Sequence, residues 1–275
     1  MSLTIDEDTA WALVRATLPN ATRVRLESPP GVWLDVHPSG RWDASAPTTA
    51  AARALLDLYL PLQLRPDLVI GQLGQSLDGR IATASGHSHY ITSRDDIRRL
   101  HRLRALVDAV VVGAGTIAAD DPRLTVREVE GDNPVRVVLD PDDRLDPKRR
   151  VFAAAAARTV VVRRASSEPV VASLKGSVVL LPVLGPDGFD LGAVLEALRA
   201  QGLRRVLVEG GGITVSRFLQ AGLLDRLHVT VAPLLIGSGR AALTLPAIDT
   251  LAQALRPRCR HFHLGDDVLF DLDLR

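Results

Sequence analysis

Two stretches of the chain combine glycines with charged side chains at the point where a buried strand is predicted to end. The first stretch, Asp108 to Arg127, begins with the β-branched run 110–112, which is typical of a parallel strand covered on both faces. Gly113 and Gly115 follow at once, and glycine allows the backbone to approach a ligand closely. The helix predicted after this turn directs free N–H groups and a partial positive charge to the same place, which favours a phosphate group. We therefore expect a nucleotide site here, and a tight turn without a ligand is the alternative.

The residues after this turn strengthen the nucleotide interpretation. Residues 113–118 read GAGTIA and fit the G-x-G-x-x-G/A dinucleotide fingerprint, which alone is a weak signal. Residues 120–127 read DDPRLTVR and place two carboxylates and two guanidinium groups within a few positions of the turn. A loop with this charge content is less easily explained by packing alone.

The second stretch centres on Glu209, which ends the predicted strand 205–208 and precedes the three glycines 210–212. Adjacent parallel strands would bring both glycine turns to the carboxyl edge of one sheet, where ligand sites of α/β proteins form. We expect the carboxylate to point into that crevice; a favourable charge at a helix N-terminus, worth roughly 0.3–1 kcal/mol, is the alternative. Three successive glycines cost backbone entropy that a simple turn does not require, so we favour a functional role.

Composition and charge exclude several classes of function. The formal net charge of +1 gives no reason to expect nucleic acid or a membrane surface as a partner. The single cysteine, Cys259, excludes a disulfide framework within the chain and a cysteine-rich zinc site. No apolar run is long enough to span a bilayer, and the first residues lack the basic-then-apolar pattern of a secretion signal. We therefore expect a soluble cytoplasmic protein.

The common motifs of metal and nucleophilic catalysis are missing from the sequence. It contains no Walker lysine pattern, no H-E-x-x-H and no G-x-S-x-G. The pairs His87 with His89 and His261 with His263 have metal-ligand spacing, but no third ligand is in view. We expect no metal site.

The chain divides into a short N-terminal part, residues 1–66, and a larger part, residues 67–275. The first part predicts a small α+β cap of unknown role, with a helix at 8–18, a hairpin at 31–42 and a helix at 48–60 that Pro61 ends. From residue 67 on, strands and helices alternate and give way to strands at the end. The predicted strands are 68–73, 109–112, 135–139, 159–163, 177–181, 205–208, 226–232, 259–264 and 268–272. This order predicts an α/β fold with a mixed, largely parallel sheet covered by helices on both faces.

Several separated motifs stand in a fixed order over roughly the last three quarters of the chain. They are SLDGRIAT at 76–83, SGHS at 85–88, HRLRA at 101–105, VGAGT at 112–116, DDPRLTVR at 120–127, PVRVVLDP at 134–141, LVEGGG at 207–212 and the segment 219–233. Together they resemble the reductase domain of the riboflavin-biosynthesis deaminase/reductase family, here standing without the deaminase domain. The resemblance implies a dihydrofolate-reductase-like fold with three α/β/α layers, NADPH as hydride donor and a homodimer.

The resemblance also implies the reaction. The family's 5-amino-6-(5-phosphoribosylamino)uracil reductase reduces the ribosyl group of a 5-amino-6-ribosylaminopyrimidine 5′-phosphate to ribityl, and some standalone members act before deamination on the 2,5-diamino compound. The expectation is thus an NADPH-dependent oxidoreductase with a phosphorylated aminopyrimidine as substrate. Two alternatives stay open: a reductase of the same fold acting on dihydrofolate, a pterin or another heterocycle, and a non-catalytic nucleotide-binding protein.

The family motifs assign site residues by position. Expected cofactor contacts are Ser88, Tyr90, Gly113, Gly115, Thr116, Asp120, Gly211, Gly212, Ile213, Thr214 and Arg217. Expected substrate contacts are Gln72, Asp78, Arg104, Leu124, Arg127 and Glu209, and expected catalytic residues are Glu209 and Asp120. Arg104 and Arg127 suit a phosphate, because guanidinium is always charged and binds bidentately.

Some assignments depart from the family pattern or carry an alternative. Gln72 stands where the family often has lysine, and Tyr90 where it has tryptophan. The pair 163–164, two arginines after a strand, could meet a 2′-phosphate or form a solvated strand end. The expected homodimer would use apolar strand edges at residues such as Leu227, Val229 and Val231.

Overall fold

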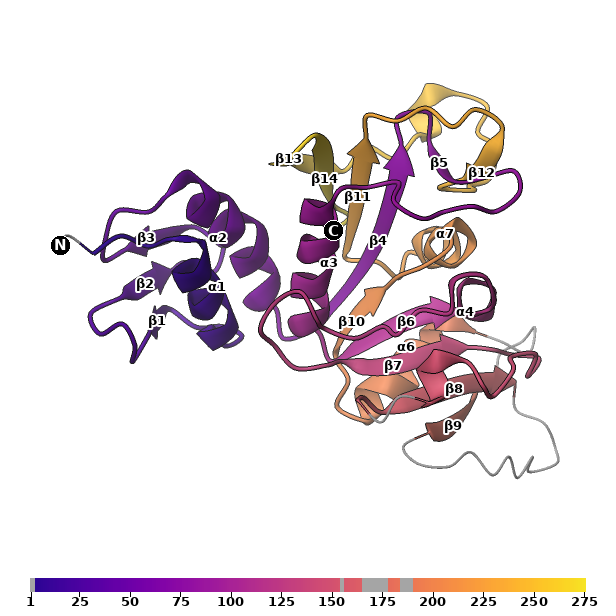
Figure 1. The fold of residues 1–275 in the computed structure, drawn as a ribbon, viewed down its shortest axis with the longest axis horizontal. Coiled ribbons are helices and arrows are strands. Elements are labelled where there is room, and N and C mark those ends of the chain that lie inside the picture. The colour runs from indigo at the N-terminus through magenta and orange to yellow at the C-terminus, as the bar shows by residue number, and fades with distance from the viewer. Residues whose placement is uncertain (1–2, 154–155, 165–177, 184–189) are drawn as a thin grey trace. The chain divides into compact units, whose positions relative to one another are not determined.

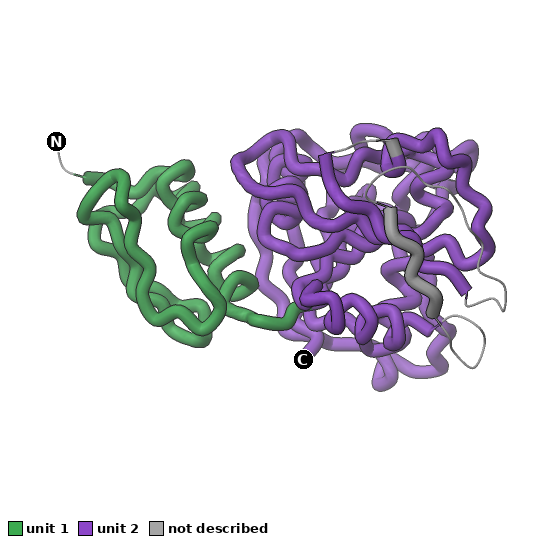
Figure 2. The backbone as a smooth tube through the Cα atoms, turned by 90° about the horizontal axis from the view of Figure 1, so that it is seen from below, with its two compact units in different colours: residues 1–68 green, residues 69–275 purple. Residues whose placement is uncertain are grey.

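The computed structural model describes residues 3–153, 156–164, 178–183 and 190–275. The chain forms two compact units, residues 1–68 and residues 69–275 (Figure 2). The division falls two residues after the predicted boundary at 66, where strand β4 (Leu68–Ser76) begins. The role of the first unit as a cap stays a prediction.

The first unit packs two helices against a small antiparallel sheet. The elements are α1 (Glu7–Ala16), β1 (Arg23–Arg25), β2 (Trp33–Val36), β3 (Trp42–Ala44) and α2 (Ala50–Gln63), with strand order β1-β2-β3. Asp6 and Thr49 cap the two helices by accepting hydrogen bonds from backbone N–H groups in the first turn. Leu34 and Val36 alternate with half-exposed residues along β2, so one sheet face carries the core of this unit.

The predicted end of the second helix at Pro61 is wrong, because α2 continues through it to Gln63. A proline inside a helix removes one backbone hydrogen bond and crowds the preceding turn. Here it lies two residues from the helix end, so little helix follows the defect. Its ring packs closely on the turn at Gly40, where an added Cβ would lie 2.5 Å from Pro61 Cγ. Tertiary packing therefore outweighs the local helix-breaking tendency.

A mixed sheet forms the centre of the second unit (Figure 1). Within the described residues it has nine strands in the order β13-β14-β11-β4-β10-β6-β7-β8-β9. The further strands are β6 (Ala109–Gly113), β7 (Val135–Leu139), β8 (Thr159–Arg164), β9 (Val178–Val183), β10 (Arg205–Val208), β11 (Arg226–Ala232), β13 (Arg258–Leu264) and β14 (Asp267–Asp273). The run β10-β6-β7-β8-β9 and the pair β4-β11 are parallel, whereas β11-β14-β13 is antiparallel. The predicted mixed, largely parallel sheet is confirmed; residue 177 of the predicted strand 177–181 lies outside the described residues.

Helices cover both faces of this sheet and give the predicted three layers. They are α3 (Arg94–Ala105), α4 (Ala114–Asp120), α5 (Arg150–Ala153), α6 (Leu191–Ala200) and α7 (Gly212–Gln220). Three further elements lie outside the main sheet: the 3₁₀ turn η1 (Leu251–Gln253) and the paired strands β5 (Arg80–Thr83) and β12 (Gly239–Ala241). Helices α6 and α7 share one core with the valines of β6, β8 and β10. An added Cβ on Gly71 of β4 would meet Val215 of α7, whereas one on Gly74 would meet Asp96 of α3. Helix α3 therefore covers the opposite face of β4 from α7 (Figure 1).

The order of strands corrects the expected dimer surface. Leu227, Val229 and Val231 lie on β11, which is paired on both sides, by β14 and by β4. Leu227 is only 1% exposed. These residues therefore form no sheet edge, and the edge on this side is β13. No helix in the described parts of the chain is long and apolar enough to cross a membrane.

Candidate active site

The two glycine turns meet at the carboxyl ends of neighbouring parallel strands. Val208 of β10 is in register with Val111 of β6, so the turns after both strands leave the same sheet edge. The Gly211 N–H donates to Thr116 Oγ1 at 2.8 Å. An added Cβ on Gly113 would lie 2.5 Å from Thr214 Oγ1, and one on Gly210 would lie 2.7 Å from Thr116 Oγ1. Each turn thus packs against a threonine of the other, and only glycine fits this approach.

A cleft of about 1040 Å³ opens at this edge. This volume is at the upper end of the range of about 300–1,000 Å³ that small-molecule sites occupy. Every residue predicted to contact a cofactor lines it: Ser88, Tyr90, Gly113, Gly115, Thr116, Asp120, Gly211, Gly212, Ile213, Thr214 and Arg217. Of the predicted substrate contacts, Gln72 lines this cleft, and Asp78, Arg104, Leu124, Arg127 and Glu209 do not.

The cleft offers donors and positive charge. Helix α7 begins at Gly212, and its N-cap residue Gly211 supplies no side-chain cap, so the first N–H groups of the helix are left for a ligand. No atom lies within 4 Å of the position that a Cβ on Gly115 would take, which leaves the backbone there open. The guanidinium groups of Arg217, Arg240 and Arg144 also line the cleft. These features suit a ligand with several phosphate groups.

The loops around the cleft hold residues in unusual backbone conformations. Tyr90, Asp121 and Leu124 have φ angles of 63°, 41° and 55°, in the left-handed region that non-glycine residues avoid. Each such residue costs on the order of 1–3 kcal/mol, and such residues cluster at functional sites. Ser88 Oγ donates to Asp120 Oδ1 at 3.1 Å, which joins two predicted cofactor contacts across the cleft.

Arg104 and Glu209, both predicted to contact the substrate, form an ion pair with each other. Arg104 Nε donates to Glu209 Oε1 at 2.8 Å and Nη2 donates to Oε2 at 2.7 Å. Arg104 and Glu209 are only 7% and 5% exposed. Glu209 therefore has both oxygens occupied and is positioned to fix the Arg104 guanidinium rather than to act as a free carboxylate.

Arg127 lies beside this pair. Its Nη1 donates to Thr125 Oγ1 at 2.8 Å, and Arg104 Nη1 donates to Thr125 O at 3.2 Å, so both cations converge on one residue. Burial, and then the charges of Arg104 and Arg123, lower the pKa of Arg127 from its usual value. Burial, and then the charges of Arg104 and Arg127, lower the pKa of His101 to about 4. The result is a positive region in which the imidazole stays neutral.

Two predicted residues have positions that serve the fold. Asp78 accepts hydrogen bonds from Ser76 Oγ and from the backbone N–H groups of Ile236 and Gly237. These bonds lower its pKa to about 2, the Ser76 bond most strongly. Leu124 is 2% exposed and lies in the core.

The arginine pair at 163–164 does not line the cleft. Arg163 is paired with Asp143, and Arg164 Nε lies 3.2 Å from Asp142 Oδ1. The structure thus gives the pair carboxylate partners on the surface. In the part of the chain that the structure describes, no group of three or more metal-ligating side chains could hold an ion.

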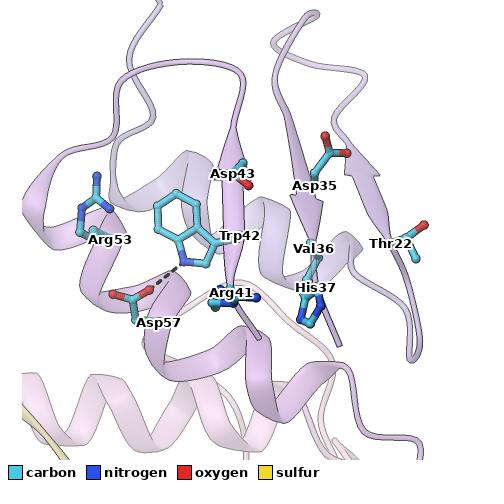
Figure 3. A pocket seen from close by; sticks show the side chains of 9 residues that line it. All are labelled: Thr22, Asp35, Val36, His37, Arg41, Trp42, Asp43, Arg53 and Asp57. Atoms are coloured by element: carbon cyan, nitrogen blue, oxygen red, sulfur yellow. Dashed lines mark hydrogen bonds between the residues drawn. The ribbon is translucent and has the colours of Figure 1, made fainter. Parts of the chain in front are cut away.

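A second hollow, of about 580 Å³, lies wholly in the first unit (Figure 3). Trp42 is its central aromatic side chain, and its Nε1–H donates to Asp57 Oδ1 at 2.7 Å. The Arg53 guanidinium lies 5.3 Å from the centre of the Trp42 ring. None of the residues predicted to bind cofactor or substrate lines this hollow.

Sequence reasoning missed the contribution of α3 to the cleft. Asp96, Ile97 and Leu100 of this helix line it, together with Gly74 and Thr92. The spacing of Ser93 and Asp96 is typical of a capping-box-like helix start, so the sequence alone indicates no ligand contact for Asp96. The Asp96 N–H does donate to Ser93 Oγ, but Ser93 N–H donates to Asp267, so the Asp96 carboxylate is used elsewhere. The only signal in the sequence was that Asp96 lies close to the apolar residues Ile97 and Leu100 on the predicted helix.

Comparison with known proteins identifies the family of the second unit. Residues 67–270 match the RibD C-terminal domain family. The chain belongs to this family. This confirms the resemblance seen in the motifs and the prediction of a reductase of riboflavin biosynthesis.

Three relatives show how much of the chain is shared. The 2,5-diamino-6-ribosylamino-4(3H)-pyrimidinone 5′-phosphate reductase of Methanothermobacter thermautotrophicus is 38% identical over 77% of this chain and 100% of its own length. RibD of Acinetobacter baumannii is 30% identical with a TM-score of 0.66, over 81% of this chain and 62% of that one. A deaminase/5-amino-6-(5-phosphoribosylamino)uracil reductase of Thermotoga maritima is 26% identical with a TM-score of 0.65, over 83% and 64%. The chain thus spans less than two thirds of both solved proteins.

Proposed function

We propose that the protein reduces the ribosyl group of 2,5-diamino-6-ribosylamino-4(3H)-pyrimidinone 5′-phosphate to ribityl, with NADPH as hydride donor. The observation that carries the proposal is the cleft at the interlocked glycine turns, which every predicted cofactor residue lines. The choice of the diamino compound rests on the Methanothermobacter reductase. The match covers the whole length of that reductase.

The residues of the cleft fit NADPH. The open backbone at Gly115 and the uncapped start of α7 suit the pyrophosphate, since helix N-termini bind phosphate groups. Arg217 and Arg240 are exposed and have no hydrogen-bonded side-chain partner among the described residues, so both guanidinium groups remain for phosphates, including the 2′-phosphate. Ser88 and Asp120, joined by a hydrogen bond, would border the nicotinamide.

The phosphate of the substrate would bind beside Arg127. Thr125 orients this guanidinium, and the Arg104–Glu209 pair fixes the second cation next to it. His101 accepts the Arg127 backbone N–H on Nδ1 at 2.9 Å and stays neutral at physiological pH, so it holds the loop without adding charge. This revises the expected roles of Arg104 and Glu209: the carboxylate positions the cation and does not itself reach the pyrimidine.

The chemistry requires alignment more than acid strength. When bound, the dihydronicotinamide supplies a hydride. The ring-opened substrate has a C1′=N imine. Carbon C1′ would accept the hydride and the imine nitrogen would take a proton from solvent as the C=N π bond opens, which leaves an amine and oxidised NADP⁺. The protein would hold the two reactants at contact distance, which is the main catalytic effect of such a site.

We further propose that the protein is a homodimer and works in the cytoplasm. The exposed edge strand β13 and Phe270 on β14, which is 38% exposed, offer a surface for a second copy. Light scattering at micromolar concentration should give twice the chain mass.

The decisive experiment is an NADPH oxidation assay with the purified protein. The diaminopyrimidinone phosphate should be reduced, and its product should carry a ribityl chain by mass spectrometry. Dihydrofolate serves as the comparison substrate. Turnover of dihydrofolate without turnover of any ribosylaminopyrimidine phosphate would reject the proposal.

A further inference from the structure

Two buried polar side chains that line the cleft have no role in the proposed binding of the cofactor. Gln72 on β4 and Asp96 on α3 both line the cleft and are only 7% and 3% exposed. They come from two elements that pack on each other, because α3 covers the face of β4 on which Gln72 and Gly74 lie. Gly74, Thr92, Ile97 and Leu100, from the same two elements and the segment before α3, also line the cleft.

Asp96 has one carboxylate oxygen occupied and one left for a ligand. Oδ1 accepts from Arg99 Nε and from Thr230 Oγ1, both at 2.7 Å. Oδ2 has no hydrogen-bond donor among the described residues. The position that a Cβ on Gly74 would take lies 2.8 Å from Thr92 Cγ2 and 3.6 Å from Asp96 Oδ2, so Gly74, Thr92 and this oxygen are close neighbours. Arg99 is 2% exposed, and its always-charged guanidinium binds Oδ1 within the protein, away from Oδ2.

Gln72 is also without a partner. Its side-chain amide makes no hydrogen bond to a described residue, and the residue lines the cleft. A polar group that lines a cleft without a protein partner bonds to water or to a ligand. Two such groups facing one cleft indicate a ligand that supplies the missing partners.

The chemistry of the pair selects a heterocycle. An amide offers one acceptor and one donor, which match an N3–H group next to a 4-oxo group. An ionised carboxylate only accepts, so the free Oδ2 needs an N–H on the next ring substituent, which is a 2-amino group. The 2,5-diamino-4(3H)-pyrimidinone ring presents these three groups in a row. The uracil ring presents a 2-oxo group in the third place, and two oxygens facing each other repel.

We infer that Asp96 and Gln72 are specificity-determining residues that bind the ring edge of the substrate, with Asp96 selecting the 2-amino ring over the deaminated 2-oxo ring. The inference rests on the proposed function and names the step at which the enzyme acts, before deamination. Gln72 contacts groups that both rings share, so it contributes to binding without discriminating between them. Of the two residues, only Asp96 contacts the 2-substituent of the ring, which deamination changes from amino to oxo.

The test compares both pyrimidine phosphates with native protein and two variants. Native protein should prefer the diamino compound. Asp96→Asn keeps the shape of the side chain but places an amide before the ring, so the preference in kcat/KM should fall by about 10- to 100-fold or reverse, at 1.36 kcal/mol per tenfold. Gln72→Leu should lower kcat/KM for both compounds by a similar factor. Asp95→Asn, one residue away and exposed, is the matched control and should change neither.

A second measurement separates this inference from the proposed reaction. Calorimetry should show that 2,5-diaminopyrimidin-4-one binds native protein more tightly than 5-aminouracil does, and that Asp96→Asn removes the difference. Ring preference without turnover would reject the reaction and keep the recognition. Turnover whose preference is the same in native protein and Asp96→Asn would overturn the inference, even where the variant is less stable, because a purely structural role lowers both activities together.

Discussion

Arg104 and Glu209, 105 positions apart in the chain, form a bidentate ion pair with N–O distances of 2.8 and 2.7 Å in a nearly closed environment. The pair joins α3 to the turn after β10. Removing one member of a buried pair leaves an uncompensated charge, whereas replacing both by apolar side chains is often tolerated. This difference separates the contribution of the pair to folding from its contribution to activity.

Glu209→Ala should therefore destabilise the protein by about 3–5 kcal/mol, as measured by urea denaturation. The double variant Arg104→Met with Glu209→Met should recover most of that stability. It should remain poorly active, because the fixed cation beside Arg127 is lost. Full activity in the stable double variant would show that the pair serves the fold alone.

Local sequence patterns predicted the parts of this site that depend on neighbouring residues. The turns at Gly113 and Gly211 follow buried valine-rich strands, and strand β10 occurs at the predicted residues 205–208. Such features are set by backbone conformation and hydrophobic pattern within a few residues. The glycine turns and the strands were accordingly recognisable, whereas the cofactor contacts were assigned from the family resemblance and stay predictions.

Features that depend on distant contacts were not recognisable. Glu209 was expected to face the crevice, but its partner Arg104 lies on another element. Asp96 seemed to be a capping residue, and only the packing of α3 on Gly74 places it in the cleft. Strand order likewise made β11 an interior strand. Pairing and packing over long sequence separations decide these outcomes, and one sequence carries no direct record of them.

Two glycines of the site should respond to alanine in opposite ways. The methyl group that Gly115→Ala adds would have no atom within 4 Å, so the variant should fold and be as stable as the native protein or more stable by about 0.5–1 kcal/mol. The same methyl group should hinder the phosphates and weaken NADPH binding by about tenfold, or 1.4 kcal/mol. An unchanged dissociation constant by fluorescence titration would place the cofactor elsewhere.

Gly212→Ala is the contrasting variant. Its Cβ would lie 2.2 Å from Ala242 O, a contact that the backbone cannot relieve without moving. We expect a loss of stability of about 1–3 kcal/mol, the usual cost of overpacking. A melting temperature equal to that of the native protein would contradict this reading of the turn.

Removal of residues 1–65 should leave the NADPH affinity unchanged. All predicted cofactor residues, and the family match at 67–270, lie in the second unit, and β4 starts only at Leu68. The shortened protein should be checked for folding by circular dichroism before its turnover is measured. Lost turnover in a folded protein would show that the first unit takes part in the reaction and is more than a cap.

His101 should make stability depend on pH. Its pKa is about 4 in the folded protein against about 6.5 when unfolded, because of burial first and then Arg104 and Arg127. The unfolded chain thus binds the extra proton between these values, so stability present above pH 6.5 is lost as the pH falls towards 4, by up to about 1.4 kcal/mol per pH unit. His101→Gln should flatten this part of the urea-midpoint profile, whereas the exposed His263→Gln should follow the native curve.

Arg127 is expected to anchor the phosphate of the substrate. A hydrogen bond to a charged group contributes about 1.5–3 kcal/mol, so Arg127→Ala should lower kcat/KM by roughly one to two orders of magnitude. NADPH affinity should change little, because Arg127 does not line the cofactor cleft. Arg98→Ala, an exposed arginine on α3 with only a 4.0 Å ion pair, is the control and should behave as native protein.

The dephosphorylated substrate completes this test. It should already be a poor substrate for the native enzyme, since the charge that Arg127 recognises is absent. Arg127→Ala should then lower its kcat/KM little further, and the ratio between the two substrates should shrink. If both substrates lose the same factor, the guanidinium does not bind the phosphate but holds the loop 125–128 through Thr125, and the anion site must lie with the cleft arginines Arg217 and Arg240.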